Sequence, residues 1–193
     1  MTQTTDPREL HQRAMAQTGS IVAAVEPGQL TLPTPCPEYD VRALLSHMVG
    51  GLNRIAVVGE GGDGMAVDPR ADGVPDDGWL AAYCTARRRV IAAWADNAKL
   101  DALIEVPWGK VPGRIALSGY IQEIIAHGWD LAKATGQPTE LSPELATWVL
   151  AVAQRILPEE PRGGQEIPFG PVVPVPPSAG PYAQLAAWLG RQP

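Results

Sequence analysis

The segment IQEIIAHGWDLAKATG (residues 121–136) has the pattern of the end of a long helix that stops at Gly136. Its apolar residues recur at the spacing of one helix face, and a glycine after the last periodic residue is a common helix stop. Glu123, His127 and Asp130 interrupt this apolar pattern. The fold and the function both depend on whether these three side chains form a solvated face or surround a bound group.

A helical wheel places the three polar residues beside the core face. At roughly 100° per residue, Glu123, His127 and Asp130 fall within about 60° of one another, with Tyr120 next to them. An unpaired carboxylate or imidazole buried at such a position would cost several kcal/mol. We therefore expect a partner for them. The adjacent apolar stripe consists of Leu117, Ile121, Ile124, Gly128 and Leu131.

The spacing of Glu123 and His127 suits a shared metal ion. Residues four apart project from successive turns, so a carboxylate oxygen and an imidazole nitrogen can reach one cation. The alternative is a hydrogen-bonded Glu–His pair on a partly exposed face. A second histidine, His47, lies at the edge of an apolar stripe on another predicted helix (41–59). Two histidines and one glutamate leave a coordination position open, as catalytic sites do.

Two adjacent glycines and the third histidine of the sequence also bear on the predicted site. Gly51 follows Gly50 inside the helix that carries His47, where each glycine costs about 1 kcal/mol relative to alanine. Backbone or ligand is therefore expected to approach closely there. His11 lies within the apolar stripe of the first helix, and we interpret it as structural, with a role in lining the site as the alternative.

Along the rest of the sequence, residues typical of helix starts and helix ends predict an all-α chain. A bundle of four helices is expected, with a short hairpin or an irregular excursion at 103–113. We assign residues 1–193 to one domain, in which a proline-rich tail from about 158 to 193 wraps over the bundle; a polyproline ligand for another protein is the alternative. The expected helices cover Pro7–Glu26, 41–59, a third beginning at Asp76 or Asp77, 115–135, 142–157 and a short one at 182–189.

Composition excludes several classes of protein. A formal net charge of −6 and a pI near 5.0 argue against a nucleic-acid partner. No run reaches the roughly 20 apolar residues of a membrane helix, and no secretory signal is visible. Cys36 and Cys84 are the only cysteines, which favours reduced thiols in a cytoplasm. Cys36 is a weak candidate nucleophile near the site, because the helix with His47 begins just after it.

Two segments carry a resemblance to a known family. PTPCPEYDVRALLSHMVGGLNR and VPGRIALSGYIQEIIAHGWDLAKATGQP resemble the actinobacterial metal-binding proteins of the DinB-like superfamily, which are related to the N-terminal domain of mycothiol-dependent maleylpyruvate isomerase. The tail PFGPVVPVPPSAGPYAQLAAWLGRQP is similar to the end of that subgroup. The resemblance implies a DinB-like four-helix bundle that holds a divalent metal.

The resemblance also implies which residues hold the metal. Carried over by position, the ligands are His47, Glu123 and His127. Zinc is the commonest metal at such sites, although nickel or iron would bind the same donors. Asp130 is expected to orient a histidine from outside the ligand set. Tyr39 stands where relatives often have tryptophan and would keep an aromatic wall.

The implied activity uses a low-molecular-weight thiol such as mycothiol. A divalent cation lowers the pKa of a coordinated thiol and so provides a nucleophile, which would add to a small electrophilic substrate. The resemblance thus implies a metal-dependent S-transferase or isomerase. A cytoplasmic location is expected from the cysteine content, and a homodimer is the assembly considered. The isomerase has a further C-terminal domain, so maleylpyruvate is not assigned as the substrate. The alternative function is a non-catalytic metal-binding bundle for interaction or storage.

Overall fold

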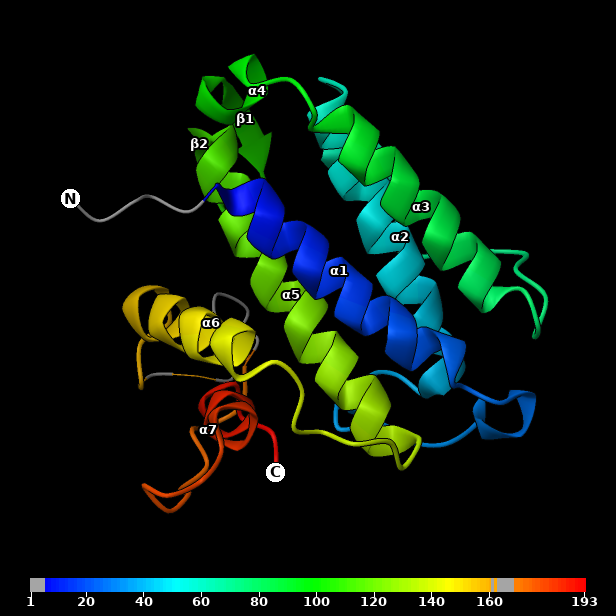
Figure 1. The fold of residues 1–193 in the computed structure, drawn as a ribbon, viewed down its shortest axis with the longest axis vertical. Coiled ribbons are helices and arrows are strands. Elements are labelled where there is room, and N and C mark those ends of the chain that lie inside the picture. The colour runs from blue at the N-terminus through cyan, green and yellow to red at the C-terminus, as the bar shows by residue number, and fades with distance from the viewer. Residues whose placement is uncertain (1–5, 161, 163–168) are drawn as a thin grey trace.

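The computed structural model describes residues 6–160, 162 and 169–193. Four long helices form a bundle in which each helix packs against two others: α1 against α5 and α3, and α2 against α3 and α5 (Figure 1). This confirms the predicted all-α four-helix bundle. The four helices are α1 (Pro7–Ala23), α2 (Val41–Gly59), α3 (Trp79–Ala93) and α5 (Gly113–Ala134).

Aspartates cap the first two helices as the sequence predicts. The Asp6 carboxylate accepts a hydrogen bond from the Arg8 amide at 2.9 Å, and the Asp40 carboxylate accepts one from the Ala43 amide at 2.8 Å. Such caps satisfy amide groups that have no partner within the helix.

The end of α1 and the start of α3 differ from the prediction for reasons that the structure shows; α5 also begins two residues early, at Gly113. Helix α1 ends at Ala23 instead of Glu26, because the ring of Pro27 would clash with the carbonyl four residues earlier. Pro27 instead begins the 3₁₀ turn η1 (Pro27–Gln29). Helix α3 begins at Trp79 and not at Asp76 or Asp77, since residues 75–78 form a turn and Asp76 pairs with Arg42.

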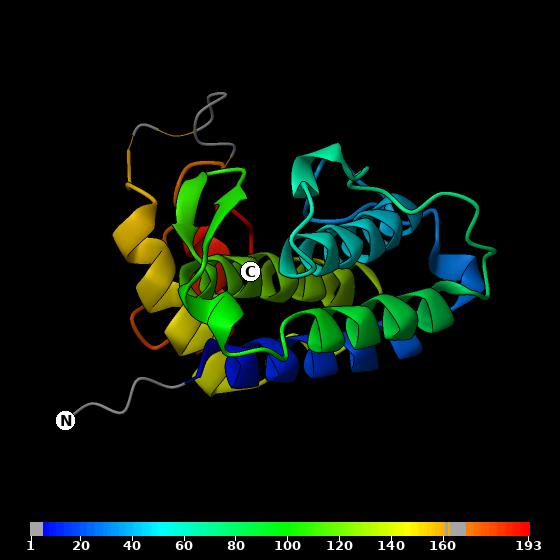
Figure 2. The same ribbon diagram turned by 90° about the horizontal axis from the view of Figure 1, so that it is seen from above.

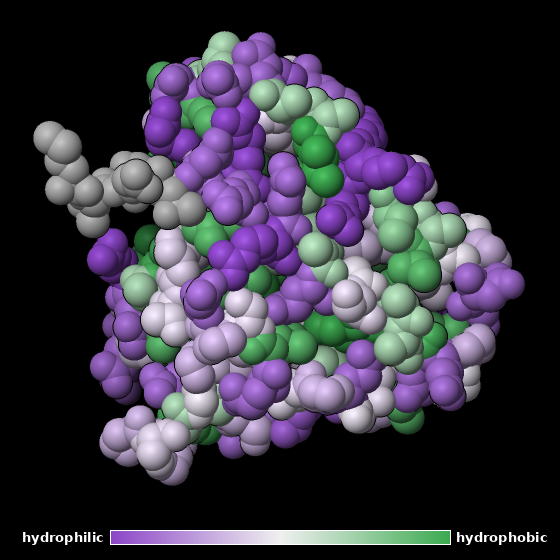
Figure 3. All heavy atoms as spheres, viewed as in Figure 1, coloured by the Kyte–Doolittle hydropathy of each residue, from purple (hydrophilic) through white to green (hydrophobic). Residues whose placement is uncertain are grey.

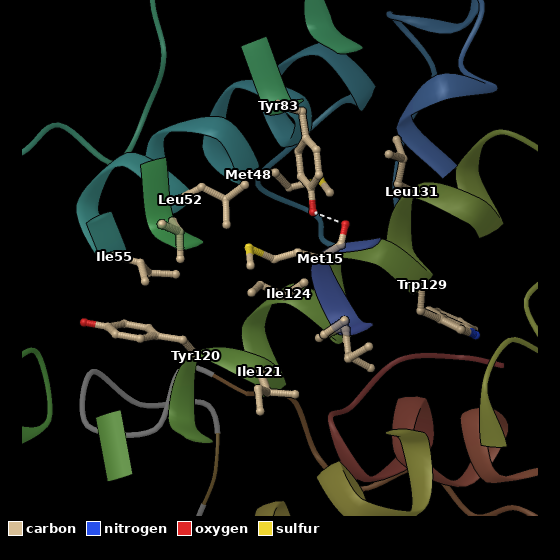
Figure 4. Close-up of a cluster of buried hydrophobic side chains, with 14 of the residues drawn as sticks. Met15, Met48, Leu52, Ile55, Tyr83, Tyr120, Ile121, Ile124, Trp129 and Leu131 are labelled. Carbon is tan, nitrogen blue, oxygen red and sulfur yellow. Dashed lines mark hydrogen bonds between the residues drawn. The ribbon is translucent and has the colours of Figure 1, made fainter. Parts of the chain in front are cut away.

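The core lies where the four helices meet. Figure 4 shows Met15, Met48, Leu52 and Ile124 converging from α1, α2 and α5. The Tyr83 hydroxyl on α3 donates to the Met15 carbonyl at 3.1 Å, which satisfies a polar group inside the core. Close packing of this kind fixes the relative positions of α2 and α5, the two helices that carry the predicted ligands.

A short hairpin precedes α5 and packs against its first half. Strands β1 (Leu103–Val106) and β2 (Gly109–Pro112) are antiparallel, so the predicted excursion at 103–113 is a hairpin. It follows the short helix α4 (Ala98–Asp101), which the sequence did not predict. Trp108 at the hairpin tip packs edge-on against Tyr120 of α5, with ring centroids 5.2 Å apart.

The C-terminal helices lie on the side of α5 away from α2 and α3 (Figures 1 and 2). Helix α6 (Pro143–Ile156) packs against α7 (Pro181–Trp188), and both contact α5. Between them, residues 169–180 have no regular secondary structure. Within the described part of the proline-rich tail, α7 therefore lies against α6 and α5. Residues 161 and 163–168 of that predicted tail lie outside the described part of the chain.

One face of the molecule is mixed in hydropathy. Hydrophilic and hydrophobic residues alternate over the face seen in Figure 3. Within the described ranges, no helix combines the length and apolar character that crossing a bilayer requires.

Candidate metal centre

The structure brings three predicted ligands together between α2 and α5. His47 projects from α2, while Glu123 and His127 project from successive turns of α5, and one potential ligand atom from each lies within 4.8 Å of the other two. The His47 Nε2 atom is 3.2 Å from Glu123 Oε1. The two imidazole rings are 5.0 Å apart and nearly perpendicular, at 89°. Residues 76 positions apart in the sequence thus form one cluster.

The glycine pair explains how the surrounding backbone packs so closely. A Cβ atom on Gly50 would lie only 2.4 Å from the Pro69 carbonyl carbon, so this glycine admits the loop after η2 (Gly64–Ala66). A Cβ atom on Gly51 would lie 3.7 Å from Glu123 Oε1, an ordinary contact. The expected close approach is confirmed at Gly50, which admits backbone; Gly51 faces the Glu123 carboxylate without requiring a glycine there.

The cluster is buried on its imidazole side and open on its carboxylate side. The side chains of His47 and His127 are 15% and 13% exposed, whereas the Glu123 side chain is 45% exposed. A cavity of about 20 Å³ adjoins the three residues, which is room for about one water molecule. A ligand can therefore approach the cluster from the side of Glu123.

Glu123 is negatively charged at neutral pH. Crowding by protein atoms raises the pKa of its carboxyl, but the hydrogen bond from His47 and the charges of His127, His47 and Arg54 outweigh this and hold the pKa below its ordinary value. An ionised carboxylate beside two imidazoles supplies one oxygen donor and two nitrogen donors.

Asp130 holds His127 in one orientation. The His127 Nδ1 atom lies 3.1 Å from Asp130 Oδ2, and an ionised carboxylate only accepts hydrogen bonds, so Nδ1 carries the proton. The Nε2 atom of His127 is then the nitrogen with a free lone pair. Asp130 is fully buried. Burial raises the pKa of its carboxyl, yet the hydrogen bonds from His127 and Arg191 bring the pKa below its ordinary value.

Arg191 is a residue of the candidate site that sequence reasoning missed. Its Nε and NH2 atoms donate to Asp130 Oδ1 and Oδ2 at 2.9 and 2.8 Å, and its side chain is only 11% exposed. Such a bidentate arginine–carboxylate pair neutralises a buried carboxylate. No periodicity links Arg191 to Asp130, because the two lie 61 residues apart, with Asp130 on α5 and Arg191 after the end of α7 (Pro181–Trp188).

Tyr39 and Cys36 lie beside the cluster, in the loop before α2. The Tyr39 ring stacks on His47 with centroids 5.0 Å apart and planes 22° from parallel. The Cys36 sulfur lies within 4.8 Å of ligand atoms of His127 and Asp130. Burial and the Asp130 charge raise the pKa of the Cys36 thiol, so it is protonated at neutral pH. Both Asp130 oxygens are already bound by Arg191, which makes this second group a poorer metal site.

Tyr120 and His11, the last two candidates from the sequence for lining the site, lie in different parts of the fold. Tyr120 lies one turn before Glu123 on α5 and is 3% exposed; its hydroxyl has no hydrogen-bond partner within the described chain. His11 lines a separate pocket between α1 and α3, together with Glu9, Met15 and Trp94. The structure therefore does not bring His11 into the cluster.

The donor set fits a divalent cation. Two imidazole nitrogens and one carboxylate oxygen are the ligands of many catalytic zinc sites, and nickel or iron binds the same donors. His127 has the supporting carboxylate that metal-bound histidines usually have. The chain could thus hold a metal through His47, Glu123 and His127, with open positions on the exposed side.

Comparisons with known proteins cover most of the chain. The family model described as the mycothiol maleylpyruvate isomerase N-terminal domain matches residues 11–132, a range that includes His47, Glu123, His127 and Asp130 but not Arg191. Two uncharacterized proteins of Mycobacterium tuberculosis, from strains CDC 1551 / Oshkosh and ATCC 25618 / H37Rv, are each 36% identical over 186 residues, which is 96% of this chain and 98% of the relative. No solved structure matches the chain significantly.

Proposed function

Because the chain belongs to the mycothiol maleylpyruvate isomerase N-terminal domain family, we propose that it is a metal-dependent enzyme that uses a low-molecular-weight thiol. The reaction would be a thiol S-transfer or an isomerisation, with mycothiol or a similar thiol as cosubstrate. The observation that carries the proposal is the open side of the cluster, where the Glu123 side chain is 45% exposed beside two buried imidazoles.

His47, Glu123 and His127 would hold the metal, most simply zinc. A bound divalent cation supplies a thiolate at neutral pH by lowering the pKa of the thiol. The remaining work belongs to the chain itself. Asp130 and Arg191 fix the ring of His127, and Tyr39 excludes water from one face of His47.

A non-catalytic metal-binding bundle is the second candidate. The small size of the adjoining cavity, about 20 Å³, favours it, because a metal in so tight a site could serve only to join α2 to α5. In that case the metal would stabilise the fold without binding substrate.

Metal analysis and calorimetry separate the two candidates. Protein purified without an affinity tag should contain about one metal ion per chain, and this metal should be lost in His47→Ala but kept in His11→Gln, the matched histidine outside the cluster. The metal-loaded protein should then bind mycothiol. Stoichiometric metal without thiol binding would support the non-catalytic bundle, and a metal content that is equal in both variants would reject both candidates.

A further inference from the structure

We propose that the pocket between the start of α1 and the end of α3 binds a small organic cation, an ammonium group carried on an apolar body. The pocket has a volume of about 380 Å³ and shares no lining residue with the cavity at the metal centre. Sites for small molecules typically measure about 300–1,000 Å³. The inference goes beyond the proposed function and does not depend on it.

Two antiparallel helices form the walls of the pocket. Helices α1 and α3 lie side by side and run in opposite directions, so the first turns of α1 lie beside the end of α3 (Figure 1). Arg8 joins the two, because its NH1 atom donates to the Ala95 carbonyl at 3.0 Å. Its Nε and NH2 atoms donate to Asp6 Oδ2 at 3.0 and 2.6 Å. The guanidinium is thus engaged on both sides and is a fixed part of the wall.

The interior of the pocket is apolar. Met15 from α1 and Val90 and Trp94 from α3 line it and are buried, and the half-buried Ile91 lies beside them on α3. Such walls favour the apolar part of a ligand, because contact with them removes its surface from water.

His11 adds a neutral polar group to this interior. Its side chain lines the pocket and is 2% exposed, and its Nε2 atom has no hydrogen-bond partner among the residues that the structure describes. Buried polar groups nearly always have a partner. Burial lowers the pKa of His11 to about 4, so at neutral pH the ring has no charge that would repel a cation. A molecule in the pocket would contact this ring.

The rim of the pocket carries an excess of negative charge. The lining residues include two carboxylates, Asp6 and Glu9, but only one cation, Arg8. Glu9 is exposed and forms no ion pair within the described part of the chain. Arg13, one turn further along α1, pairs with Glu144 instead. The Glu9 carboxylate is therefore available to an ammonium group.

Two cations outside the pocket are already engaged. Arg114, whose charge acts on Asp6, pairs with Asp101. Lys99 Nζ donates to the Ala93 carbonyl, the last residue of α3, at 2.7 Å. The last turn of α3 has no basic residue of its own, and the partial negative charge at a helix C-terminus favours a cation. The rim thus favours an ammonium group over a carboxylate.

The probe for this site is phenethylammonium, with phenethyl alcohol as its uncharged analogue and phenylacetate as its anionic one. Binding to the metal-free full chain is followed by NMR at neutral pH, because the sequence has only 3 histidines and their ring protons report the place of binding. We expect phenethylammonium to shift the His11 signals and to leave those of His47 and His127 unchanged. Affinity should fall from ammonium to alcohol to carboxylate, by up to about fivefold at each step, as for an exposed ion pair.

Two variants test the two ends of the ligand. Glu9→Gln should weaken phenethylammonium binding by up to about fivefold and leave phenethyl alcohol unaffected. Ile91→Ala should weaken the binding of both by roughly threefold or more, because the apolar wall loses methyl and methylene groups. The matched controls are Glu105→Gln on β1 and Leu80→Ala on α3, two exposed residues that do not line the pocket. Both controls should bind phenethylammonium like the wild type, and circular dichroism verifies that every variant is folded.

Three results would overturn the site. The first is that phenethylammonium leaves the His11 signals unchanged or shifts those of His47 or His127 instead. The second is that phenylacetate binds as tightly as phenethylammonium, and the third is that Glu9→Gln and Glu105→Gln bind phenethylammonium equally. None of these results bears on the thiol-dependent function, which metal content and mycothiol binding test at the other site.

Discussion

His11 and His127 occupy similar positions in sequence but very different surroundings in the fold. Each lies within or beside the apolar stripe of a bundle helix, and each is largely shielded from water. His11 has no polar partner for its Nε2 atom within the described residues. His127 instead bonds to Asp130, which in turn is bound by Arg191. The helix position decides that a histidine is buried, and its neighbours decide what it can do.

The consequence is electrostatic. Burial lowers the pKa of His11 to about 4, so its imidazole is neutral at neutral pH. Around His127 two carboxylates, Glu123 and Asp130, are ionised because hydrogen bonds hold their pKa values down. The surroundings of His11 are therefore a neutral part of the packed core. The surroundings of His127 hold negative charge that a cation could neutralise.

The largest effect is expected when Asp130, the carboxylate that supports His127, loses its cationic partner. Arg191→Ala leaves the buried Asp130 carboxylate without its cation, and we expect the free energy of unfolding to fall by about 3–5 kcal/mol, as for a buried ion pair that loses one partner. Affinity for metal should fall by about 10- to 100-fold, because the orientation of His127 is loosened. Urea denaturation and metal titration measure the two effects.

Arg89→Ala is the control for this change. Arg89 pairs with Glu60 at 2.7 Å, but both side chains are more than 40% exposed (43% and 42%). An exposed pair contributes roughly 0–1 kcal/mol, and neither of these two residues belongs to the cluster. If the two alanine variants lose equal stability, the Asp130–Arg191 pair does not support the site as the geometry indicates.

The next test concerns pH and the His11 region. The unfolded imidazole binds a proton below about pH 6.5, whereas the folded one does so only below about 4. Stability from the neutral imidazole is thus fully present above the unfolded pKa and is lost as pH falls toward the folded pKa. At about 1.4 kcal/mol per pH unit, roughly 3 kcal/mol should disappear between pH 6.5 and 4.

His11→Leu should remove this loss, because leucine fills the site and does not titrate. The measurement is the urea midpoint of both proteins at several pH values between 7 and 4, where the carboxylates contribute equally to each. Parallel stability curves for the wild type and His11→Leu would show that His11 is not the buried neutral group described above.

The sequence predicted those features that depend on local periodicity. Glu123 and His127 share a helix face, and His47 marks the edge of another, so both ligand-bearing faces follow from helical spacing. Asp6 and Asp40 cap their helices for equally local reasons. The bundle itself follows from the number and length of the amphipathic segments.

Long-range contacts could not be predicted in this way. Arg191 meets Asp130, and Trp108 covers Tyr120, because of how α7 and the hairpin pack, and no repeat in the sequence records such packing. The start of α3 was predicted too early for the same reason. Asp76 has the composition of a helix cap, but Arg42 from another helix binds its carboxylate.

The smallest expected effect comes from Gly50 and Gly51, two neighbouring glycines on α2, the helix that carries His47 of the cluster. In Gly51→Ala the new Cβ atom meets Glu123 Oε1 at 3.7 Å, an ordinary contact, so better helix propensity should raise stability by up to about 1 kcal/mol without loss of metal. In Gly50→Ala the Cβ atom would lie 2.4 Å from the Pro69 backbone, and overpacking should lower stability by about 1–3 kcal/mol. Urea midpoints of the two variants should therefore shift in opposite directions. A shift in the same direction would mean that the loop at Pro69 yields to the added methyl group, and that Gly50 is not what allows this loop to pack beside the cluster.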